Sequence, residues 1–394
     1  MKEKRVLISG GGTGGHIVPG IAIYKEFKNR NINVLFLSDR RDVRFSSIKD
    51  ISPDDLCTYN APPFTRNVLM LPIFAIKFAI AVIKARMIMR RNNVHVVIGM
   101  GGYVTAPVLA AAKMRKTTIC LCEQNSVPGK VTSLFEKHAL RVYSTLPVTR
   151  DYLKYKEKFL HSGNPINKKV FANVDKDEAK KVFHLRHCDK VILVIGGSQG
   201  ALKINELVFG LKKEYEDDLK NVGIIWSTGD FSYKKFKELV HNEIDEGSMY
   251  LSPYINEVGM AYKACDIAIS RSGAGVIMEL AAMGIPSIQI PYPHAAMDHQ
   301  DKNADYFVKV RAAIKVKNSD AVPEKVAPLL LDLLNNPRLL NNMSEKAKSL
   351  SKIDASEFIC DDVIKNILKI KVDISAKGPS GLQGEGSGPL SVED

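Results

Sequence analysis

The segment that decides the fold is VLISGGGTGGH at residues 6–16, an apolar run that ends in a glycine-rich turn. A second segment, VILVIGGSQGA at residues 191–201, has the same arrangement in a different sequence. The first turn satisfies the pattern G-x-G-x-x-G through Gly10, Gly12 and Gly15. Glycines let the backbone approach a phosphate, and the N-terminus of the following helix offers free N–H groups. Each half of the chain is therefore predicted to open with a phosphate-binding turn.

Short apolar runs alternate with helical patterns in both halves, which predicts an α/β protein with two doubly wound parallel sheets. The expected strands are residues 6–9, 34–37, 94–98, 118–121 and 141–144, then 190–195, 223–226, 249–251, 267–270 and 287–290. Two Rossmann-like domains would face a central cleft that handles two phosphorylated molecules. We assign residues 1–162 to an N-terminal domain and 163–375 to a C-terminal domain. Residues 376–394, rich in Gly, Ser and Pro, are expected to be a disordered tail.

The composition is that of a globular protein, because 45% of the 394 residues are hydrophobic and 25% are charged. It excludes a collagen, a coiled coil, a small disulfide scaffold and a wholly disordered chain. The net charge of +13 is uneven: residues 1–160 hold 26 Lys and Arg against 11 Asp and Glu, and the remainder holds 30 against 32. A basic half predicts an anionic partner, either nucleic acid or a membrane surface. Nucleic acid is disfavoured, since no nucleic-acid-binding motif is present and aromatic residues make up only 7%.

The location of the protein follows from three features. The six cysteines lack a framework spacing and are expected to be core thiols in a reducing compartment. MKEKR leads directly into the first expected strand, which leaves no room for a signal peptide. The most apolar run, residues 68–83, is interrupted by Pro72 and Lys77 and is shorter than the ~20 residues that span a bilayer. We therefore expect a cytoplasmic protein that is soluble or peripheral.

Two residues near the first turn suggest different chemistry. His16 lies at the start of the following helix and could act as a general base or a hydrogen-bond donor. Asp39, 24 residues after Gly15, could bind a ribose, so an NAD-dependent oxidoreductase is an alternative hypothesis. The second phosphate-type turn and the imidazole at the helix start both disfavour that alternative.

The densest segment is SRSGAGVIMELAAMGIPSIQIPYPHAAMDHQDKNADYF at residues 270–307. The turn after its first strand comprises Arg271, Ser272, Gly273 and Ala274. Its N–H groups and the helix dipole suit a diphosphate, and Arg271 adds a positive charge. Glu279 falls about one turn into the helix, where a carboxylate can accept from both hydroxyls of a ribose. Glu123 and Asn125 follow another expected strand, at the carboxyl end where open α/β sheets bind ligands.

Together these segments resemble the MurG family of UDP-N-acetylglucosamine:lipid I N-acetylglucosaminyltransferases. The matching pieces, in order over residues 6–310, are GGTGGHIVPGIAI, GGYVTAPVLAA, EQNSVPGKV, SGNPI, GGSQGA and the block from SRSGAGVIMELAAMGIP to HQDKNA. The resemblance implies a GT-B fold whose last helix packs back on the first domain. It implies that the second domain binds UDP-GlcNAc and the first binds lipid I at the membrane. The implied reaction is an inverting transfer of GlcNAc to the MurNAc 4-hydroxyl, which makes lipid II for peptidoglycan.

By motif position, the resemblance assigns the donor contacts to Thr13, Gly14, Gly15, Asn125, Ser198, Ile255, Glu279 and Gln300. Ile255 is expected to contact the uracil through its backbone. Asn167 stands where the family carries an Arg, whose charge it cannot supply. Lys168 could substitute in part, although it lies one residue along and lacks the planar fork of Arg.

An inverting displacement needs a base for the acceptor hydroxyl, and the sequence leaves two candidates. His16 is the first and Glu123 the second. With helix termini at the diphosphate, no bound metal and no tightly held cofactor are expected, although soluble Mg²⁺ could assist.

Residues 71–91 are the expected membrane-facing element. Lys77, Lys84 and Arg91 are seven residues apart and form one stripe on a helix, with Phe74 and Ile80 nearby. At about 1 kcal/mol for each basic residue near anionic lipid, docking would be weak and sensitive to salt. An anionic surface at the cytoplasmic face of the bacterial inner membrane is the expected partner, and other cell-wall synthesis proteins could bind too. The alternatives are an ordinary buried helix with basic ends and, for the whole protein, a GT-B enzyme that glycosylates another lipid, such as a diacylglycerol.

Overall fold

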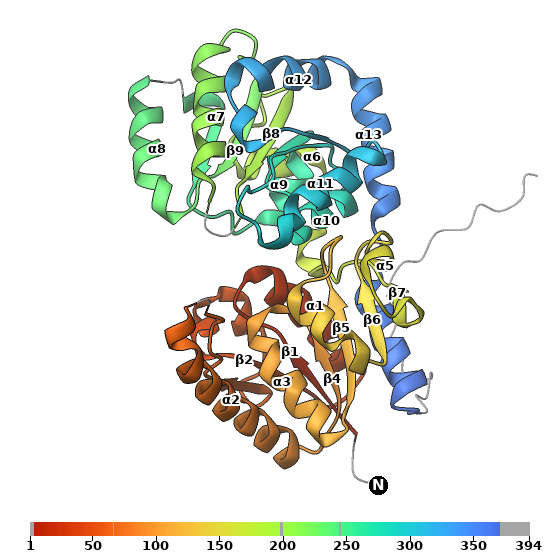
Figure 1. Cartoon of the computed structure of the whole chain (residues 1–394). Helices are drawn as coiled ribbons and strands as arrows, with labels where there is room; N and C mark the ends of the chain where they lie inside the picture. The colour runs from red at the N-terminus through yellow and green to blue at the C-terminus, as the bar shows by residue number, and fades with distance from the viewer. Residues whose placement is uncertain (1–3, 66, 198–199, 244–245, 371–394) are drawn as a thin grey trace, which may run out of the picture.

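Two α/β domains lie against one another in the computed structural model, which describes residues 4–65, 67–197, 200–243 and 246–370 (Figure 1). The first domain contains a seven-stranded sheet in the order β3-β2-β1-β4-β5-β6-β7. Its strands, paired in parallel, are β1 (Arg5–Ser9), β2 (Val34–Asp39), β3 (Leu56–Tyr59), β4 (Val94–Gly99), β5 (Thr118–Glu123), β6 (Arg141–Ser144) and β7 (Phe159–His161).

The second domain contains a six-stranded sheet in the order β10-β9-β8-β11-β12-β13. Its strands, also paired in parallel, are β8 (Lys190–Ile195), β9 (Val222–Ser227), β10 (Met249–Ser252), β11 (Ile267–Ser270), β12 (Ser287–Gln289) and β13 (Ala313–Lys315). Both sheets thus reverse their winding beside their first strand, between β1 and β4 and between β8 and β11.

Helices cover both faces of each sheet, which explains why the central strands are apolar throughout. Along β1, Val6 and Ile8 pack on one side with α1, and Leu7 packs on the other with α2 and α3. The helices of the first domain are α1 (Gly14–Asn29), α2 (Leu71–Arg91), α3 (Gly102–Arg115), α4 (Lys130–Phe135) and α5 (Thr149–Tyr152). Those that follow are α6 (Lys176–Val182), α7 (Leu202–Glu214), α8 (Asp230–Glu243), α9 (Val258–Ala264), α10 (Ala274–Met283), α11 (His299–Lys309), α12 (Pro323–Asn335), α13 (Pro337–Leu350) and α14 (Ala355–Asp361).

The ten expected strands are all present, and the doubly wound α/β architecture is confirmed. Three strands were not expected: β3, β7 and β13. Each has only three or four residues and lies at the edge of its sheet. Edge strands are covered less completely than central ones, so their sequences lack a continuous apolar run.

The expectation that Pro72 and Lys77 interrupt the apolar run is wrong. Residues Val68–Arg91 form one helical segment of 24 residues that is long and apolar enough to cross a membrane by length and composition. Pro72 lies in the first turn of α2, where its missing N–H costs no hydrogen bond. In the most apolar stretch of 18 residues in this helix, only 11% of the residues are buried. The helix therefore exposes most of its apolar side chains.

The end of the described chain returns to the first domain. After α13 the chain descends from the second domain to the region of β6 and β7 (Figure 1). Ile359, Cys360 and Val363 join the core formed by α1 and the central strands. Tyr143 Oη donates to Asp362 at 2.6 Å, and Arg30, directly after α1, pairs with Asp361. The expected disordered tail, residues 376–394, lies outside the described residues.

Replacing Ile359 by Ala tests this packing. The side chain is completely buried, so its truncation is expected to lower the free energy of unfolding by about 2–5 kcal/mol. Ile353→Ala is the matched control, because Ile353 is 64% exposed and should change stability by less than about 0.5 kcal/mol. Urea unfolding followed by circular dichroism measures both variants. Equal losses in the two variants would contradict the packing of α14.

Candidate functional site

The switch points of the two sheets define the candidate site. In doubly wound sheets, ligands bind beyond the carboxyl ends of the strands where the winding reverses. The loops at these points follow β1 and β4 in the first domain and β8 and β11 in the second. Helices α1 and α10, which follow β1 and β11, contact each other across the domain boundary. The two switch points therefore contribute to one shared region.

The N-termini of α1 and α10 are open to an anion. The residues before them, Thr13 and Gly273, make no side-chain cap, and neither first turn contains an acidic residue. A Cβ atom added at Gly14 or Gly275 would meet nothing within 4 Å. The first N–H groups of a helix have no partner within it, and the helix dipole makes this end positive. Both termini can accept a phosphate group.

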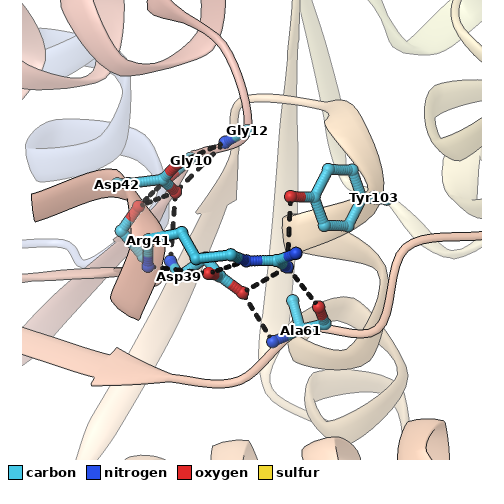
Figure 2. Close-up of polar contacts among 8 residues, drawn as sticks. Gly10, Gly12, Asp39, Arg41, Asp42, Ala61 and Tyr103 are labelled. Atoms are coloured by element: carbon cyan, nitrogen blue, oxygen red, sulfur yellow. Dashed lines mark hydrogen bonds and ion pairs between the residues drawn. The ribbon is translucent and has the colours of Figure 1, made fainter. Parts of the chain in front are cut away.

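The buried carboxylate of Asp42, in the short helix directly after β2, supports the first glycine turn (Figure 2). Asp42 accepts from the N–H of Gly12 at 3.1 Å. Ser38 Oγ lies 2.7 Å from both the Gly10 carbonyl and an Asp42 oxygen. The N–H of Gly12 is therefore already used, so an anion at this turn must be bound by the N–H groups that follow.

Asp39 is occupied by a different set of contacts (Figure 2). Arg41 donates to both of its oxygens, at 2.7 and 3.0 Å, and the N–H of Ala61 donates at 2.7 Å. Burial would raise the pKa of the Asp39 carboxyl, but hydrogen bonds from Arg41 and Ala61 outweigh it and hold the pKa below its usual value. A carboxylate bound in this way has no free edge for a ribose. The hypothesis of an NAD-dependent oxidoreductase therefore loses Asp39 as its ribose-binding acid.

His16 lies in the loop region of the first switch point. A Cβ at Gly101 would stand 3.2 Å from its Nε2, and one at Gly102 would stand 3.0 Å from its Nδ1, so these two glycines make room for the ring. Thr13 Oγ1 lies 3.1 Å from Nδ1. Burial lowers the pKa of His16 to about 4, against a backbone hydrogen bond at Gly11 that raises it. The imidazole is therefore neutral near pH 7, and the same burial makes it a weaker base than an ordinary histidine.

Glu123, the second candidate base, has a different role in the structure. One carboxylate oxygen accepts from the backbone N–H and Nδ2 of Asn125, at 3.1 and 3.3 Å. The other accepts from the N–H of Gly129 at 2.9 Å and from Thr132 Oγ1 at 2.6 Å. Both oxygens are thus already hydrogen-bonded, and neither is available to an acceptor hydroxyl. Glu123 holds the loop after β5 in shape, and we withdraw it as a base.

Glu279 is the titratable group of the second domain's half of the site. Its carboxylate accepts from Tyr262 Oη at 2.6 Å. Burial raises its pKa to about 7, although the Tyr262 hydrogen bond acts in the opposite direction. The group is therefore partly protonated at neutral pH. Sequence reasoning missed Tyr262, which lies on α9 and meets Glu279 only in the folded chain.

Arg271 does not face the open end of α10 as expected. Its Nη1 donates to the carbonyls of Ile290 and Pro291 and to Asn318 Oδ1, at 2.8–3.1 Å. This nitrogen therefore secures the segment after β12. Ser272 lies at the expected turn, but its hydroxyl is used internally and donates to the Gln300 carbonyl at 2.8 Å.

Asn167 and Lys168 also lie away from the expected diphosphate site. Asn167 caps a short 3-10 helix by accepting from the N–H of Lys169, and it lines a cavity of about 190 Å³ beside the middle of α1. Lys168 pairs with Glu357 at 2.7 Å. Neither residue replaces the missing guanidinium at the open helix termini.

The remaining predicted donor contacts divide into two groups. The structure places Thr13, Gly14, Gly15, Asn125, Gly273, Ala274 and Gln300 at the switch-point loops or the first turns that follow them. Ile255 is buried in the segment after β10, at the same carboxyl edge of the second sheet. Ser198 lies outside the described residues. Among the residues that the structure describes, no group of three or more His, Cys, Asp or Glu side chains could hold a metal ion.

Asn303 is a buried residue at the candidate site that the sequence analysis did not select. It connects the loop after β5 to the loop after β11 through hydrogen bonds to Asn125, Ser126 and Ser272. Its spacing of one turn from Gln300 on an expected helix was the available indication.

Both halves of the chain match models of glycosyltransferase family 28. The N-terminal domain model covers residues 6–144 and the C-terminal domain model covers residues 191–359. The fold is shared with the solved Acinetobacter baumannii MurG (24% identity, TM-score 0.69, covering 91% of this chain and 98% of that chain). It is also shared with a UDP-GlcNAc 2-epimerase from Neisseria meningitidis bound to UDP-GlcNAc (14% identity, TM-score 0.66, covering 92% and 100%). These neighbours confirm the GT-B architecture.

Two curated relatives carry the name UDP-N-acetylglucosamine–N-acetylmuramyl-(pentapeptide) pyrophosphoryl-undecaprenol N-acetylglucosamine transferase. The protein from Desulforamulus reducens is 32% identical over 93% of this chain and 98% of its own length. The protein from Caldanaerobacter subterraneus subsp. tengcongensis is 35% identical over 89% and 97%. Since the similarity extends over nearly the whole length, the chain belongs to this family of N-acetylglucosamine transferases within glycosyltransferase family 28.

Proposed function

We propose that this chain transfers GlcNAc from UDP-GlcNAc to the MurNAc 4-hydroxyl of lipid I, with inversion at the sugar carbon, in peptidoglycan synthesis. The observation that carries the proposal is the pair of uncapped helix N-termini, α1 and α10, at the switch points of two domains in contact. The reaction brings together a nucleotide diphosphate and a lipid diphosphate, and each terminus suits one of them. Family membership identifies the two substrates.

The donor belongs to the second domain. The N-terminus of α10 is the site for the UDP diphosphate, with Glu279 accepting from the ribose and the backbone of Ile255 contacting the uracil. Ser198, outside the described residues, and Gln300 complete the predicted donor contacts of the second domain. From the first domain, the predicted donor contacts are Thr13, Gly14, Gly15 and Asn125. Because Arg271 and Asn167 make contacts elsewhere, backbone N–H groups and the helix dipole provide the stabilisation of the departing UDP. No resident metal is part of the proposal, and soluble Mg²⁺ is retained as an activator to be tested.

The acceptor belongs to the first domain. The N-terminus of α1 is the site for the lipid diphosphate, and His16, two residues further along, is the base that removes the proton from the acceptor hydroxyl. The donor is an α-glycoside and the expected product a β-glycoside, so a single in-line displacement accounts for the inversion. The neutral imidazole has a lone pair that can accept that proton, although burial and the positive helix terminus both disfavour the imidazolium that forms.

Helix α2 is the proposed membrane contact of the first domain. Ile73, Ile76, Ile80 and Ile83 are exposed, and the exposed Lys77 and Lys84 lie beside that apolar row. Phe74, by contrast, is half-buried. The opposite face of α2, with Ala81, Val82, Ala85 and Met89, is buried in the core of the first domain. Spanning a bilayer would expose that core, so α2 is proposed to lie on the cytoplasmic face of the membrane.

A product assay tests the function directly. Purified protein, UDP-GlcNAc labelled in the sugar, and either lipid I or diacylglycerol are incubated, and the products are separated and digested with a β-specific hexosaminidase. A labelled, hexosaminidase-sensitive product from lipid I alone supports the proposal. A product from diacylglycerol alone would support another lipid glycosyltransferase instead.

Replacing His16 by Ala is expected to lower kcat by at least ~10²-fold, which is the low end for loss of a general base. The KM for UDP-GlcNAc should change much less, because His16 is not among the predicted donor contacts. Steady-state kinetics measure both constants. A kcat near that of the wild type would remove His16 from this role.

Glu279 gives the donor KM a dependence on pH. With a pKa of about 7, the carboxylate is mostly protonated at pH 6 and mostly ionised at pH 8. Only the ionised form accepts from both ribose hydroxyls, so the KM for UDP-GlcNAc should fall by up to ~10-fold as the pH rises across this range.

Glu279→Gln is expected to raise the donor KM and to abolish this pH dependence. Glu324→Gln is the control, since Glu324 is an exposed carboxylate on α12. A Glu279→Gln variant that keeps the wild-type pH profile would reject the ribose assignment.

Charge reversal on α2 tests the membrane contact. Lys77→Glu combined with Lys84→Glu should abolish flotation with vesicles that contain anionic lipid, because about 1 kcal/mol is lost for each basic residue. The matched control is Lys234→Glu with Lys237→Glu on α8 of the second domain, where both lysines are exposed. Wild-type flotation should weaken at high salt. Binding that ignores both salt and the α2 charges would contradict the proposal.

A further inference from the structure

Asn303 joins the two domains at the centre of the candidate site. It lies on α11 and is completely buried. Its Oδ1 accepts from the N–H of Ser126 at 2.8 Å, and its Nδ2 donates to Asn125 Oδ1 at 3.2 Å. The same Nδ2 donates to the Ser272 carbonyl at 3.1 Å. We call the loop after β5, with Asn125 and Ser126, the acceptor-side loop and the loop after β11, with Ser272, the donor-side loop. The amide of Asn303 uses its oxygen and its nitrogen to bind the acceptor-side loop, and the same nitrogen also binds the donor-side loop.

The contacts of Asn303 continue a chain of hydrogen bonds across the domain boundary. On one side, Asn125 Nδ2 donates to Glu123, the last residue of β5, at 3.3 Å. On the other side, Ser272 lies between β11 and α10. The chain thus connects the carboxyl end of a strand in each sheet, directly beside the open N-terminus of α10. A change at Asn303 would move the two loops relative to each other.

The first turn of α11 also holds the donor-side loop, through the backbone of Gln300. Gln300 lies three residues before Asn303, on the same side of the helix. Its carbonyl accepts from Ser272 Oγ at 2.8 Å, and its Oε1 accepts from the N–H of Tyr292 at 3.0 Å. The loop after β11 is therefore fixed to α11, and Asn303 is a side chain through which α11 makes hydrogen bonds to the first domain.

Other contacts across the boundary do not set the same geometry. Leu146 packs against Ile277 and Met278 of α10, but apolar contact has no preferred direction. Ser126 Oγ is buried without a hydrogen-bond partner among the described residues, so Asn303 holds Ser126 through its backbone N–H. A buried amide whose donor and acceptor are both used fixes both distance and orientation.

We propose that Asn303 is the positioning residue that sets the relative position of the donor-side and acceptor-side loops, which we call their register. Its effect on catalysis rests on the proposed function, because the register matters only if donor and acceptor occupy the two sides. The register itself is a property of the folded chain and can be measured without any substrate.

Asn303→Asp is the diagnostic substitution. The oxygen that replaces Nδ2 would face Asn125 Oδ1 and the Ser272 carbonyl, which turns two hydrogen bonds into repulsions. Asn303→Ala removes the same bonds without a new charge and serves if the Asp variant does not fold. The matched control is Asn205→Asp, which alters an equally buried amide whose partners, Trp226 and Thr228, lie in the second domain.

Three measurements separate positioning from mere stability. We expect the Asn303 variants to lower kcat by at least ~10-fold, as misplacement of reacting groups does. The Kd for UDP, measured by calorimetry, should stay within ~3-fold of the wild-type value, because the proposed ribose and uracil contacts, Glu279 on α10 and the buried Ile255 after β10, lie on other elements of the second domain. Asn205→Asp should lower the Tm and leave kcat unchanged.

Distance between the domains is the readout that needs no activity. Spin labels at M114C on α3 and V182C on α6 report it, with C57S as background because the other native cysteines are buried. We expect a broader distance distribution for the Asn303 variants and the wild-type distribution for Asn205→Asp. An unchanged distribution in the Asn303 variants, or an equal loss of kcat in Asn205→Asp, would overturn the proposal. A wild-type protein that transfers no GlcNAc would refute the proposed function but leave the distance result to decide the register.

Discussion

The free N–H groups at the start of α1 and α10 are the constraint on which the site depends. A helix cannot satisfy its first N–H groups internally, and here the residues that could cap them are glycine or a threonine that makes no cap. Doubly wound topology places such termini at the switch point of each sheet. Two domains built in this way and placed in contact produce two anion sites in one region. A reaction between two diphosphate-bearing molecules is what this arrangement suits.

Three charged side chains near the site are hydrogen-bonded to other groups of the protein. Asp42 supports the first glycine turn, Glu123 shapes the loop after β5, and Arg271 secures the segment after β12. Each of these groups is buried, and a buried charge is stable only when it is paired or hydrogen-bonded. Their contacts fix the backbone of the loops around the candidate site. Pre-organised backbone dipoles can stabilise developing charge without moving during the reaction.

The domains are also joined away from the site. Lys168, in the segment between the sheets, pairs with Glu357 of α14, and Arg30, directly after α1, pairs with Glu26 and Asp361. The C-terminal helix thereby belongs to the core of the first domain although it follows the second in sequence. The chain crosses the boundary twice, which limits how the domains can move. Asn303 joins the domains within that limit, beside the candidate site.

Local sequence patterns were sufficient for the architecture and for much of the site. Apolar runs and glycine turns depend on neighbouring residues, so the central strands, the starts of α1 and α10, and the position of His16 could be inferred directly. Side-chain availability could not be inferred, because the partners are distant in sequence. Asn303 meets Asn125 across 178 positions, and Asp42 meets Gly12 across 30. Only the folded chain shows that Glu123, Arg271 and Asn167 are already bound to other parts of the protein, while the N-termini of α1 and α10 stay open. The sequence by itself determined which backbone turns could bind an anion. The tertiary structure decided which side chains were left to assist those turns, because the partners that use up a side chain's hydrogen bonds are brought to it only by folding.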